Sequence, residues 1–329
     1  MSAKAIIIDT PGAPDAMQWR DVAIPEPKEG ELLIRQKAVG LNYIDCYHRQ
    51  GLYGLTDFPA TIGLEGAGVI ERVGPNCQFG FKAGQRVCYA GGPIGAYAQY
   101  RTLPERHAIL MPDSLREEHL AGVMVKGLTA HYLLRRTFIV NEHATVLVQA
   151  AAGGVGLLLC QWAKHLGATV IGTVGTEEKA ELAHANGCDY PLLYTRDDVP
   201  ARVREITEGR GCNVVYDSVG GEGFMRLLDC LMPFGMMVSY GEAAGPVPPV
   251  ALNELQKRGS LFVTRTSFED YLQEHGEYLL ASQTLLELIE QGHLKTNIRQ
   301  SYYLKDAARA HAALESRQTT GASIFYTEA

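Results

Sequence analysis

The chain has 329 residues, a length typical of two domains. Hydrophobic residues make up 46% of it and charged residues 20%, an ordinary balance for a globular protein. The formal net charge is −7. This acidity argues against nucleic acid as the main partner, because proteins that neutralise a phosphate backbone usually carry a basic face.

The seven cysteines are odd in number, and no two of them stand at C-x-x-C spacing. The sequence therefore predicts neither a disulfide framework nor a zinc knuckle. The first residues, MSAKAIIIDT, do not follow the plan of a signal peptide, and no apolar run reaches the length of a membrane span. We expect a cytoplasmic protein without a membrane partner.

The first part of the chain, up to about residue 120, predicts strands and turns. Its short β-type runs lie at residues 4–8, 31–41, 67–74 and 85–90, with glycine and proline between them. This pattern is typical of a compact, partly barrel-like β domain.

Residues 115–136 have the hydrophobic periodicity of a helix, and after them the sequence pattern alternates between strands and helices. The expected strands are 145–149, 169–175, 212–220, 235–241 and 260–265, and the expected helices are 154–167, 176–187, 200–209 and 223–232. Short apolar strands between helices predict a parallel sheet that is covered on both faces. Helices at 277–292 and 304–317 and a strand at 322–326 complete the chain.

The stretch VLVQAAAGGVG, residues 146–156, has the frame of a dinucleotide fingerprint, with Ala151 in place of the first glycine. Gly153 allows the backbone to approach a pyrophosphate, and Gly156 allows close packing of helix on strand. A glycine turn without a ligand is the alternative. The position of the motif, after an apolar strand and at the start of a helix, favours the cofactor.

The second strand of this series ends in Gly175-Thr176, without the carboxylate that usually holds the ribose of NAD. Thr176 and Lys179 offer a hydroxyl and a cation for a 2′-phosphate, so the sequence favours NADPH. Glu177 and Glu178 are explained as first-turn acids of the next helix. Tyr194, after the third strand, stacks near the adenine or ribose, or else packs as an ordinary half-buried aromatic.

Several stretches together resemble the medium-chain dehydrogenase/reductase superfamily, and most of all its zinc-free NADPH:quinone oxidoreductases, the group that includes zeta-crystallin. These stretches are GLNYIDCYHRQGLY, FPATIGLEGAGVIERVG, GQRVCYA, GAYAQY, KGLTAHYLL, QAAAGGVG and VVYDSVGG, and they span essentially the whole chain.

The resemblance implies an α/β protein with two domains. Residues 1–122 and 267–329 would form a GroES-like, β-rich catalytic domain, and residues 123–266 a Rossmann domain with a doubly wound parallel sheet. Members of this group are commonly homodimers that pair through their Rossmann domains, so we expect the same here.

The resemblance also bears on metal. Zinc-dependent relatives carry Cys at the position of Asn42 and His at the position of Leu64, and neither an amide nor an isobutyl group replaces these ligands. Cys46 and His48 offer two ligands without a third. We expect no metal, and we expect Glu65 to make a structural hydrogen bond.

A quinone suits a site without a Lewis acid, because its reduction restores aromaticity. By resemblance, Asn42, Tyr47 and Tyr53 line the substrate pocket, where their amide and phenol groups donate to a quinone oxygen. Simple packing is the alternative for the two tyrosines.

The cofactor-binding set that the motif and the resemblance imply extends over both domains. It comprises Asn42, Lys126, Thr129, Ala152, Gly153, Gly154, Val155, Gly175, Thr176, Lys179, Tyr194, Ser218, Tyr240, Gly241, Arg265 and Arg317. A surface salt bridge is the alternative role of Lys126.

The expected function is reduction of a small or apolar quinone by NADPH, through transfer of a hydride or of single electrons. One alternative is an NADPH-dependent reductase of 2-alkenals and other enones. Another is an NADPH-binding protein with a structural or RNA-binding role, which the acidic charge disfavours.

Overall fold

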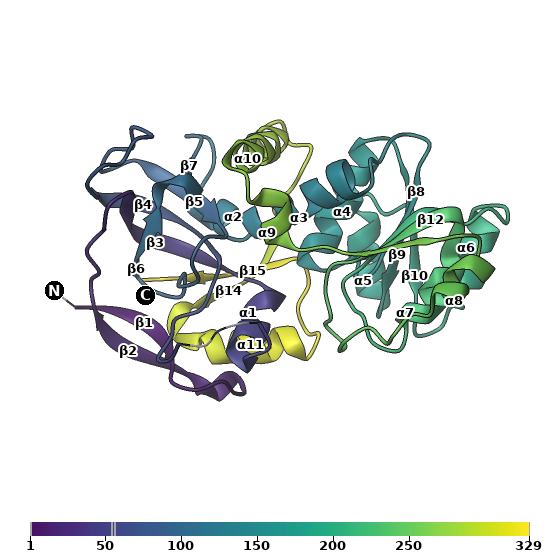
Figure 1. The fold of residues 1–329 in the computed structure, drawn as a ribbon, viewed down its shortest axis with the longest axis horizontal. Helices are drawn as coiled ribbons and strands as arrows, with labels where there is room; N and C mark the ends of the chain where they lie inside the picture. Colours follow the sequence, from purple (N-terminus) through teal and green to yellow (C-terminus); the bar gives the residue numbers. More distant parts are fainter. Residues whose placement is uncertain (1, 54, 56, 329) are drawn as a thin grey trace. The chain divides into compact units, whose positions relative to one another are not determined.

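A computed structural model describes residues 2–53, 55 and 57–328 (Figure 1). The chain folds as two compact units. The first comprises the described residues of Met1–Lys126, Ser282–Leu286 and Thr296–Ala329, and the second comprises Gly127–Ala281 and Glu287–Lys295.

The first unit is built on a seven-stranded sheet with the order β14-β15-β3-β4-β5-β7, in which β6 also pairs with β3. The strands are β3 (Glu31–Leu41), β4 (Glu65–Val73), β5 (Arg86–Ala90), β6 (Tyr100–Pro104), β7 (Ala108–Leu110), β14 (Ile298–Tyr303) and β15 (Ala322–Tyr326). A separate hairpin pairs β1 (Ser2–Ile8) with β2 (Met17–Ala23). The four runs expected as strands in this part of the sequence are confirmed as β1, β3, β4 and β5.

The core of the first unit gathers apolar residues from both ends of the chain. Leu32 and Ile34 of β3, Ile70 of β4 and Phe325 of β15 are completely or almost completely buried and belong to one cluster. β15 lies beside β3 in antiparallel register, with Phe325 opposite Val39. Residues near position 325 are therefore part of the same core as residues near position 32.

Several elements of this unit were not expected from the sequence. They are α1 (Tyr43–Gln50), which follows β3, and the strands β2, β6, β7 and β14, of which β14 pairs with β15 in parallel. α2 (Glu117–Ala121), which follows β7, lies within the helix expected over 115–136. The expected helix at 304–317 is confirmed as α11 (Ala307–Glu315), which a 3₁₀ turn precedes.

The second unit contains a six-stranded, fully parallel sheet with the order β10-β9-β8-β11-β12-β13. Numbered within the unit, this is the strand order 3-2-1-4-5-6 of the Rossmann fold. The strands are β8 (Thr145–Val148), β9 (Thr169–Val174), β10 (Tyr190–Leu193), β11 (Cys212–Asp217), β12 (Leu231–Ser239) and β13 (Phe262–Arg265).

Helices follow most of these strands, as the alternating sequence predicts. They are α4 (Gly154–His165), α5 (Glu177–His184), α6 (Val199–Ile206), α7 (Phe224–Leu227), α8 (Leu252–Lys257) and α9 (Phe268–Leu272). α4 packs on β8 and β9, and α5 packs on β9 and β10. α10 (His275–Glu290) has residues in both units and confirms the helix expected at 277–292.

The helix expected over 115–136 is wrong as one continuous element. The segment forms α2, then α3 (Met124–Tyr132) and a π-helical turn, Leu133–Thr137. The break falls at Gly122, where an added Cβ would lie 2.6 Å from Ile298 and 2.7 Å from Ile324. Close packing against these side chains therefore fixes the position of the break.

The helix expected over 223–232 is too long. α7 and a 3₁₀ turn end at Cys230, and β12 begins at Leu231, which pairs with Cys212 of β11. Pairing with a distant strand overrides the local helical pattern here.

The two units differ in detail from the domain boundaries expected at residues 122 and 266. Residues 123–126 belong to the first unit, and residues 267–281 belong to the second. The roles expected for these parts, catalytic and dinucleotide-binding, stay predictions at this point. No helix within the described ranges is long and apolar enough to cross a membrane.

Candidate functional site

The glycine-rich turn lies between β8 and α4, at the carboxyl end of the first strand of the parallel sheet. Gly153 is the N-cap of α4, with an extended backbone at φ −80° and ψ 175°. An added Cβ there would meet only the Ala150 carbonyl, at 3.1 Å. The first turn of α4 holds no acidic residue, so its amides are suited to bind a phosphate group.

Gly156 has a different role in the same turn. A Cβ at this position would lie 2.2 Å from the Ala150 carbonyl oxygen and 2.9 Å from Ala151 Cα. These are backbone atoms, so the contact has no flexible side chain that moves aside. The geometry agrees with the expected role of Gly156, the close packing of helix on strand.

The end of β9 brings together four residues of the expected cofactor set. Thr176 caps α5, and its Oγ1 accepts a hydrogen bond from the Lys179 amide at 3.3 Å. The Tyr194 hydroxyl oxygen lies 2.6 Å from the point where a Cβ of Gly175 would stand. The hydroxyl groups of Thr176 and Tyr194 therefore lie beside one strand end, next to the first turn of α5 that carries Lys179.

Four charged residues lie near this strand end. Glu177 and Glu178 lie in the first turn of α5, where the sequence placed them, and a hydrogen bond to Thr176 lowers the pKa of Glu178. Arg196, which was not expected to take part, lies 3.0 Å from Glu177 and 3.3 Å from Asp197. Its charge is compensated by these two carboxylates.

The carboxyl ends of β11, β12 and β13 form the next part of the sheet edge. A Cβ at Gly241 would lie 2.6 Å from the Ser218 carbonyl oxygen, so the backbones that follow β11 and β12 are in contact. Arg265 ends β13 and donates to Ser239 Oγ at 2.9 Å and to the Gly241 carbonyl at 3.0 Å. Tyr240 lies between them in sequence, and its burial raises its pKa.

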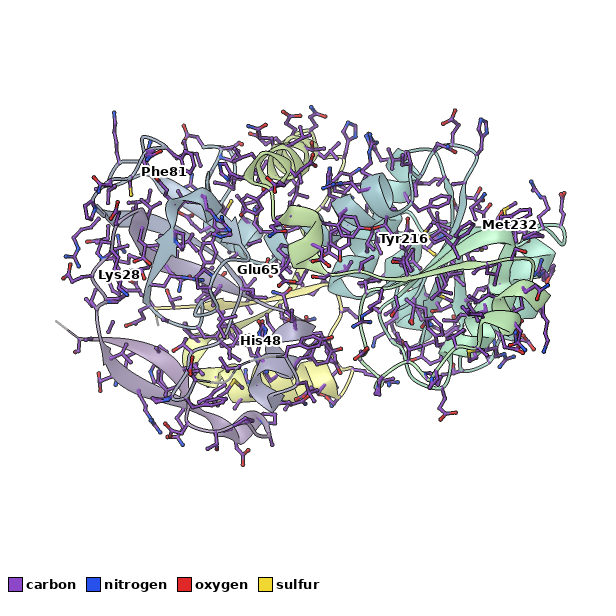
Figure 2. The ribbon with its side chains drawn as sticks, in the orientation of Figure 1. Lys28, His48, Glu65, Phe81, Tyr216 and Met232 are labelled. Atoms are coloured by element: carbon purple, nitrogen blue, oxygen red, sulfur yellow. The ribbon has the colours of Figure 1, made fainter. Side chains whose placement is uncertain are left out.

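In the first unit, Asn42, Glu65 and Lys126 form a buried polar network. Asn42 is the N-cap of α1, Glu65 begins β4 and is labelled in Figure 2, and Lys126 lies in α3. Asn42 Nδ2 donates to Glu65 Oε1 at 2.8 Å, and Lys126 Nζ donates to Asn42 Oδ1 and to Glu65 Oε1, both at 2.8 Å.

The burial of this network was not visible in the sequence. Glu65 is 0% exposed, Lys126 5% and Asn42 7%. Lys126 therefore does not form the surface salt bridge that was its alternative role. Glu65 was expected to make a structural hydrogen bond, and it accepts from Asn42, from Lys126 and, at 2.7 Å, from the Val125 amide.

The expected pocket tyrosines lie in contact with each other. The rings of Tyr47 and Tyr53 are 5.0 Å apart at an angle of 75°, and the ring of Tyr43 lies 5.4 Å from that of Tyr47. Tyr53 is 38% exposed. This arrangement suits an aromatic pocket wall as well as plain packing.

A second buried polar network fixes α1, and no local pattern in the sequence indicates it. The Tyr97 hydroxyl lies 3.1 Å from Asp45 Oδ2 and 3.0 Å from His311 Nε2. Arg49 donates to His311 Nδ1 at 3.1 Å and to Glu315 at 2.7 Å. Since a guanidinium only donates, His311 Nδ1 is the acceptor, and its Nε2 carries the proton.

Burial determines the protonation states of Asp45 and His311 in this network. It raises the pKa of Asp45 to about 7, and Asp45 Oδ2 also accepts from the Asn42 amide at 2.8 Å. Burial, helped by the charge of Arg49, lowers the pKa of His311 to about 3, so the imidazole is neutral near pH 7. These hydrogen bonds hold α1, the helix whose N-cap is Asn42.

The other expected cofactor residues are distributed over both units. Asn42, Lys126 and Arg317 belong to the first unit. Arg317 adopts φ 61° directly after α11. The rest, including the buried Thr129 and Ala152, belong to the second unit.

Among the residues that the structure describes, no group of three or more His, Cys, Asp or Glu side chains is arranged to hold a metal ion. Cys46 lies 3.4 Å from His311 and is buried, which raises its pKa. The expectation of a metal-free site rests on the identities of Asn42 and Leu64.

The 3-2-1-4-5-6 strand order and the open glycine turn together define the dinucleotide-binding class of α/β proteins. Comparison with known families agrees with both units. Residues 28–113 match the model "Alcohol dehydrogenase GroES-like domain", and residues 154–276 match "Zinc-binding dehydrogenase".

Individual relatives cover the chain almost completely. A quinone oxidoreductase of Pseudomonas aeruginosa is 44% identical over 98% of this chain and 99% of its own length. A 2-haloacrylate reductase of a Burkholderia species is 41% identical over 99% of both chains. The crystal structure of Escherichia coli quinone oxidoreductase complexed with NADPH is 42% identical, with a TM-score of 0.96 over 98% of this chain and 99% of that one.

The chain therefore belongs to the quinone oxidoreductases of the medium-chain dehydrogenase/reductase superfamily, and it is an oxidoreductase. The family and the fold class expected from the sequence, a GroES-like domain with a Rossmann domain, are confirmed.

Proposed function

We propose that this chain reduces quinones with NADPH and without a metal ion. The observation that carries the proposal is the open backbone at Gly153, where an added Cβ meets only one atom, at 3.1 Å. It stands at the N-terminus of α4, on the first strand of a sheet with Rossmann order. This is the place where such folds bind the pyrophosphate of a dinucleotide.

The residues at the end of β9 support NADPH over NADH. Thr176 caps α5 at this strand end, and Lys179 lies in the first turn of the helix, at its positive end. The two residues thus carry a hydroxyl and an ammonium group. A 2′-phosphate needs such donors. Bound NADPH supplies the hydride, and the chain's part is to bind and orient its two ends.

The first unit supplies the acceptor side of the proposal. Asn42 and the Tyr47–Tyr53 pair offer amide and phenol donors to a quinone oxygen on which negative charge develops. A quinone needs no Lewis acid, because reduction makes its ring aromatic. The relatives named quinone oxidoreductase, at 44% identity over nearly the whole chain, support this acceptor.

A second candidate function is reduction of a carbon–carbon double bond conjugated to a carbonyl or carboxyl group. The 2-haloacrylate reductase, 41% identical over 99% of this chain, favours it. The same donors would then hold the carbonyl or carboxylate oxygen of the acceptor.

We also propose that the active form is a homodimer paired through the second unit. β13 is the last strand of its sheet, and Phe262 and Val263 on it are 57% and 38% exposed. An exposed apolar edge strand is a template for pairing with another strand. A second copy of β13 satisfies this edge. The cytoplasmic location stays a prediction.

The test measures oxidation of NADPH and of NADH by chelator-treated protein, with a simple para-quinone, an enone and 2-haloacrylate as acceptors. We expect fast, NADPH-selective turnover with the quinone and no stoichiometric zinc by metal analysis. Turnover of the enone or haloacrylate alone would replace the quinone function by the second candidate. One zinc per chain would contradict the metal-free site.

A further inference from the structure

The Asn42–Glu65–Lys126 network buries two opposite charges and an amide from distant parts of the sequence. The three side chains come from three separate elements, α1, β4 and α3, and Asn42 and Lys126 are 84 positions apart in the sequence. All three polar groups meet at distances of 2.8 Å. Such a buried ion pair is costly to desolvate, and it is often no more stable than apolar residues of the same size.

The chemistry of the two charged groups fixes the orientation of the Asn42 amide. An ammonium group cannot accept, so the atom beside Lys126 Nζ must be the amide oxygen. A carboxylate cannot donate, so the atom beside Glu65 Oε1 must be the amide nitrogen. The flipped amide would place donor against donor and acceptor against acceptor.

This orientation also fixes the direction of the second N–H bond of the Asn42 amide. The Asn42 NH₂ group has two N–H bonds, and one of them is directed at Glu65. The other N–H is thereby held in one direction, with its polarity increased by the neighbouring carboxylate.

Glu65 is also enclosed by backbone. A Cβ at Gly40 would lie 2.1 Å from Glu65 Oε1 and 2.3 Å from the Ala121 carbonyl. The backbone of β3 therefore approaches the carboxylate directly, and Val125 binds its second oxygen. The carboxylate has little freedom to move, and the amide that it holds shares this rigidity.

We propose that Glu65 and Lys126 are positioning residues that lock the Asn42 carboxamide, so that its second N–H donates to the carbonyl oxygen of the acceptor. The inference rests on the proposed function, because it takes Asn42 as the group that touches the acceptor. It replaces direct cofactor binding as the role of Lys126.

The main test uses Glu65→Gln, which keeps the shape of the side chain. Three donors, from Asn42, Lys126 and Val125, would then face a single acceptor oxygen. We expect kcat to fall at least tenfold, with KM and the NADPH dissociation constant changed less than threefold. The same substitution in an Asn42→Leu background should have little further effect, because its action passes through Asn42.

A second variant covers the case in which Glu65→Gln fails to fold. Glu65→Leu with Lys126→Met removes both charges together and fills the space with apolar groups. We expect a Tm near that of the wild type and the same loss of kcat. If the pair were only structural, the restored stability would restore turnover. Full kcat in a folded variant, or equal losses with and without Asn42, would overturn the proposal.

A matched control removes another ion pair of the same unit. Arg86 of β5 lies 3.0 Å from Glu117 of α2, and both side chains are partly buried. Arg86→Met with Glu117→Leu should lower Tm and leave kcat per folded molecule unchanged.

A readout without turnover separates this inference from the proposed function. The side-chain amide signals of Asn42, assigned in the ¹⁵N spectrum through Asn42→Leu, should exchange slowly with solvent in the wild type and faster in Glu65→Gln. A freely exchanging amide in the wild type would overturn the inference. A locked amide in a protein that reduces no quinone would instead count against the proposed function alone.

Discussion

Asp45 and His311 share one hydroxyl group, that of Tyr97, and all three side chains are 0% exposed. In the unfolded chain near pH 5.5, the carboxyl group is charged and the imidazole carries a proton. In the folded chain the preferences are reversed, because burial raises the pKa of Asp45 to about 7 and lowers that of His311 to about 3. The pair therefore folds in its neutral form.

The two groups oppose each other in their effect on stability. Asp45 stabilises the fold below its ordinary pKa of 3.8, and this contribution is lost as the pH rises to about 7. His311 stabilises the fold above its ordinary pKa of 6.5, and this contribution is lost as the pH falls towards about 3. Between about pH 4 and 6.5, the stability contribution of Asp45 falls with rising pH while that of His311 rises, so the two pH dependences nearly cancel.

Substitution of either residue should leave the pH dependence of Tm that the other residue causes. We expect the Tm of Asp45→Asn to fall more steeply than that of the wild type as the pH drops from 6.5 to 4.5, and the Tm of His311→Gln to fall less steeply or to rise. Thermal unfolding at several pH values checks this. Curves parallel to that of the wild type would contradict the opposed titration.

Gly153 and Gly156 should differ in what they tolerate. Gly153→Val should keep the fold, since the backbone is extended and the only near atom lies at 3.1 Å, but the added methyl groups would block the pyrophosphate. Gly156→Ala should lower stability by about 1–3 kcal/mol, because its Cβ would meet the Ala150 carbonyl at 2.2 Å. Tm and NADPH titrations distinguish the two, and unimpaired NADPH binding by Gly153→Val would return this turn to a purely structural role.

Lys179 should select for the 2′-phosphate. Lys179→Ala should raise the dissociation constant of NADPH about tenfold, equivalent to ~1.4 kcal/mol, and that of NADH less than twofold. Arg196→Ala is the matched control, and its effect should be smaller because two carboxylates already compensate Arg196. Equal effects of Lys179→Ala on both nucleotides would refute the role of its charge.

The exposed edge of β13 should hold two copies together. Phe262→Lys with Val263→Lys should convert a dimer into a monomer in sedimentation experiments, because two charged edges repel each other. Ile139→Lys, at a side chain that is 70% exposed in the same unit, is the control and should leave the dimer intact. A wild-type monomer at micromolar concentration would exclude this assembly.

The Rossmann unit could be predicted in most of its strands because its sequence carries the information locally. Strands buried on both faces are continuous apolar runs, and helices separate them at regular intervals. The predicted element boundaries are wrong where contact with a distant residue determines the local structure. Leu231 leaves the helical pattern to pair with Cys212, and Gly122 interrupts a helix to pack on Ile298.

α1 was missed for a related reason. Its buried side chains include Asp45 and Arg49, which local patterns assign to the surface. Arg49 is buried against His311 and Glu315, more than 260 positions away. Asn42 was expected at the site from resemblance, but no sequence pattern joins it to Lys126. The network that holds it becomes visible only in three dimensions.

The place of β15 in its sheet has a consequence for biosynthesis. This strand, Ala322–Tyr326, lies between β14 and β3, and Phe325 completes a core that begins with residues of β1 and β3. The ribosome must therefore release more than three hundred residues before the first unit can close. The strands of the second unit are contiguous in the sequence and are synthesised earlier. The nascent chain can therefore complete its Rossmann sheet before β15 is available to pair with β3.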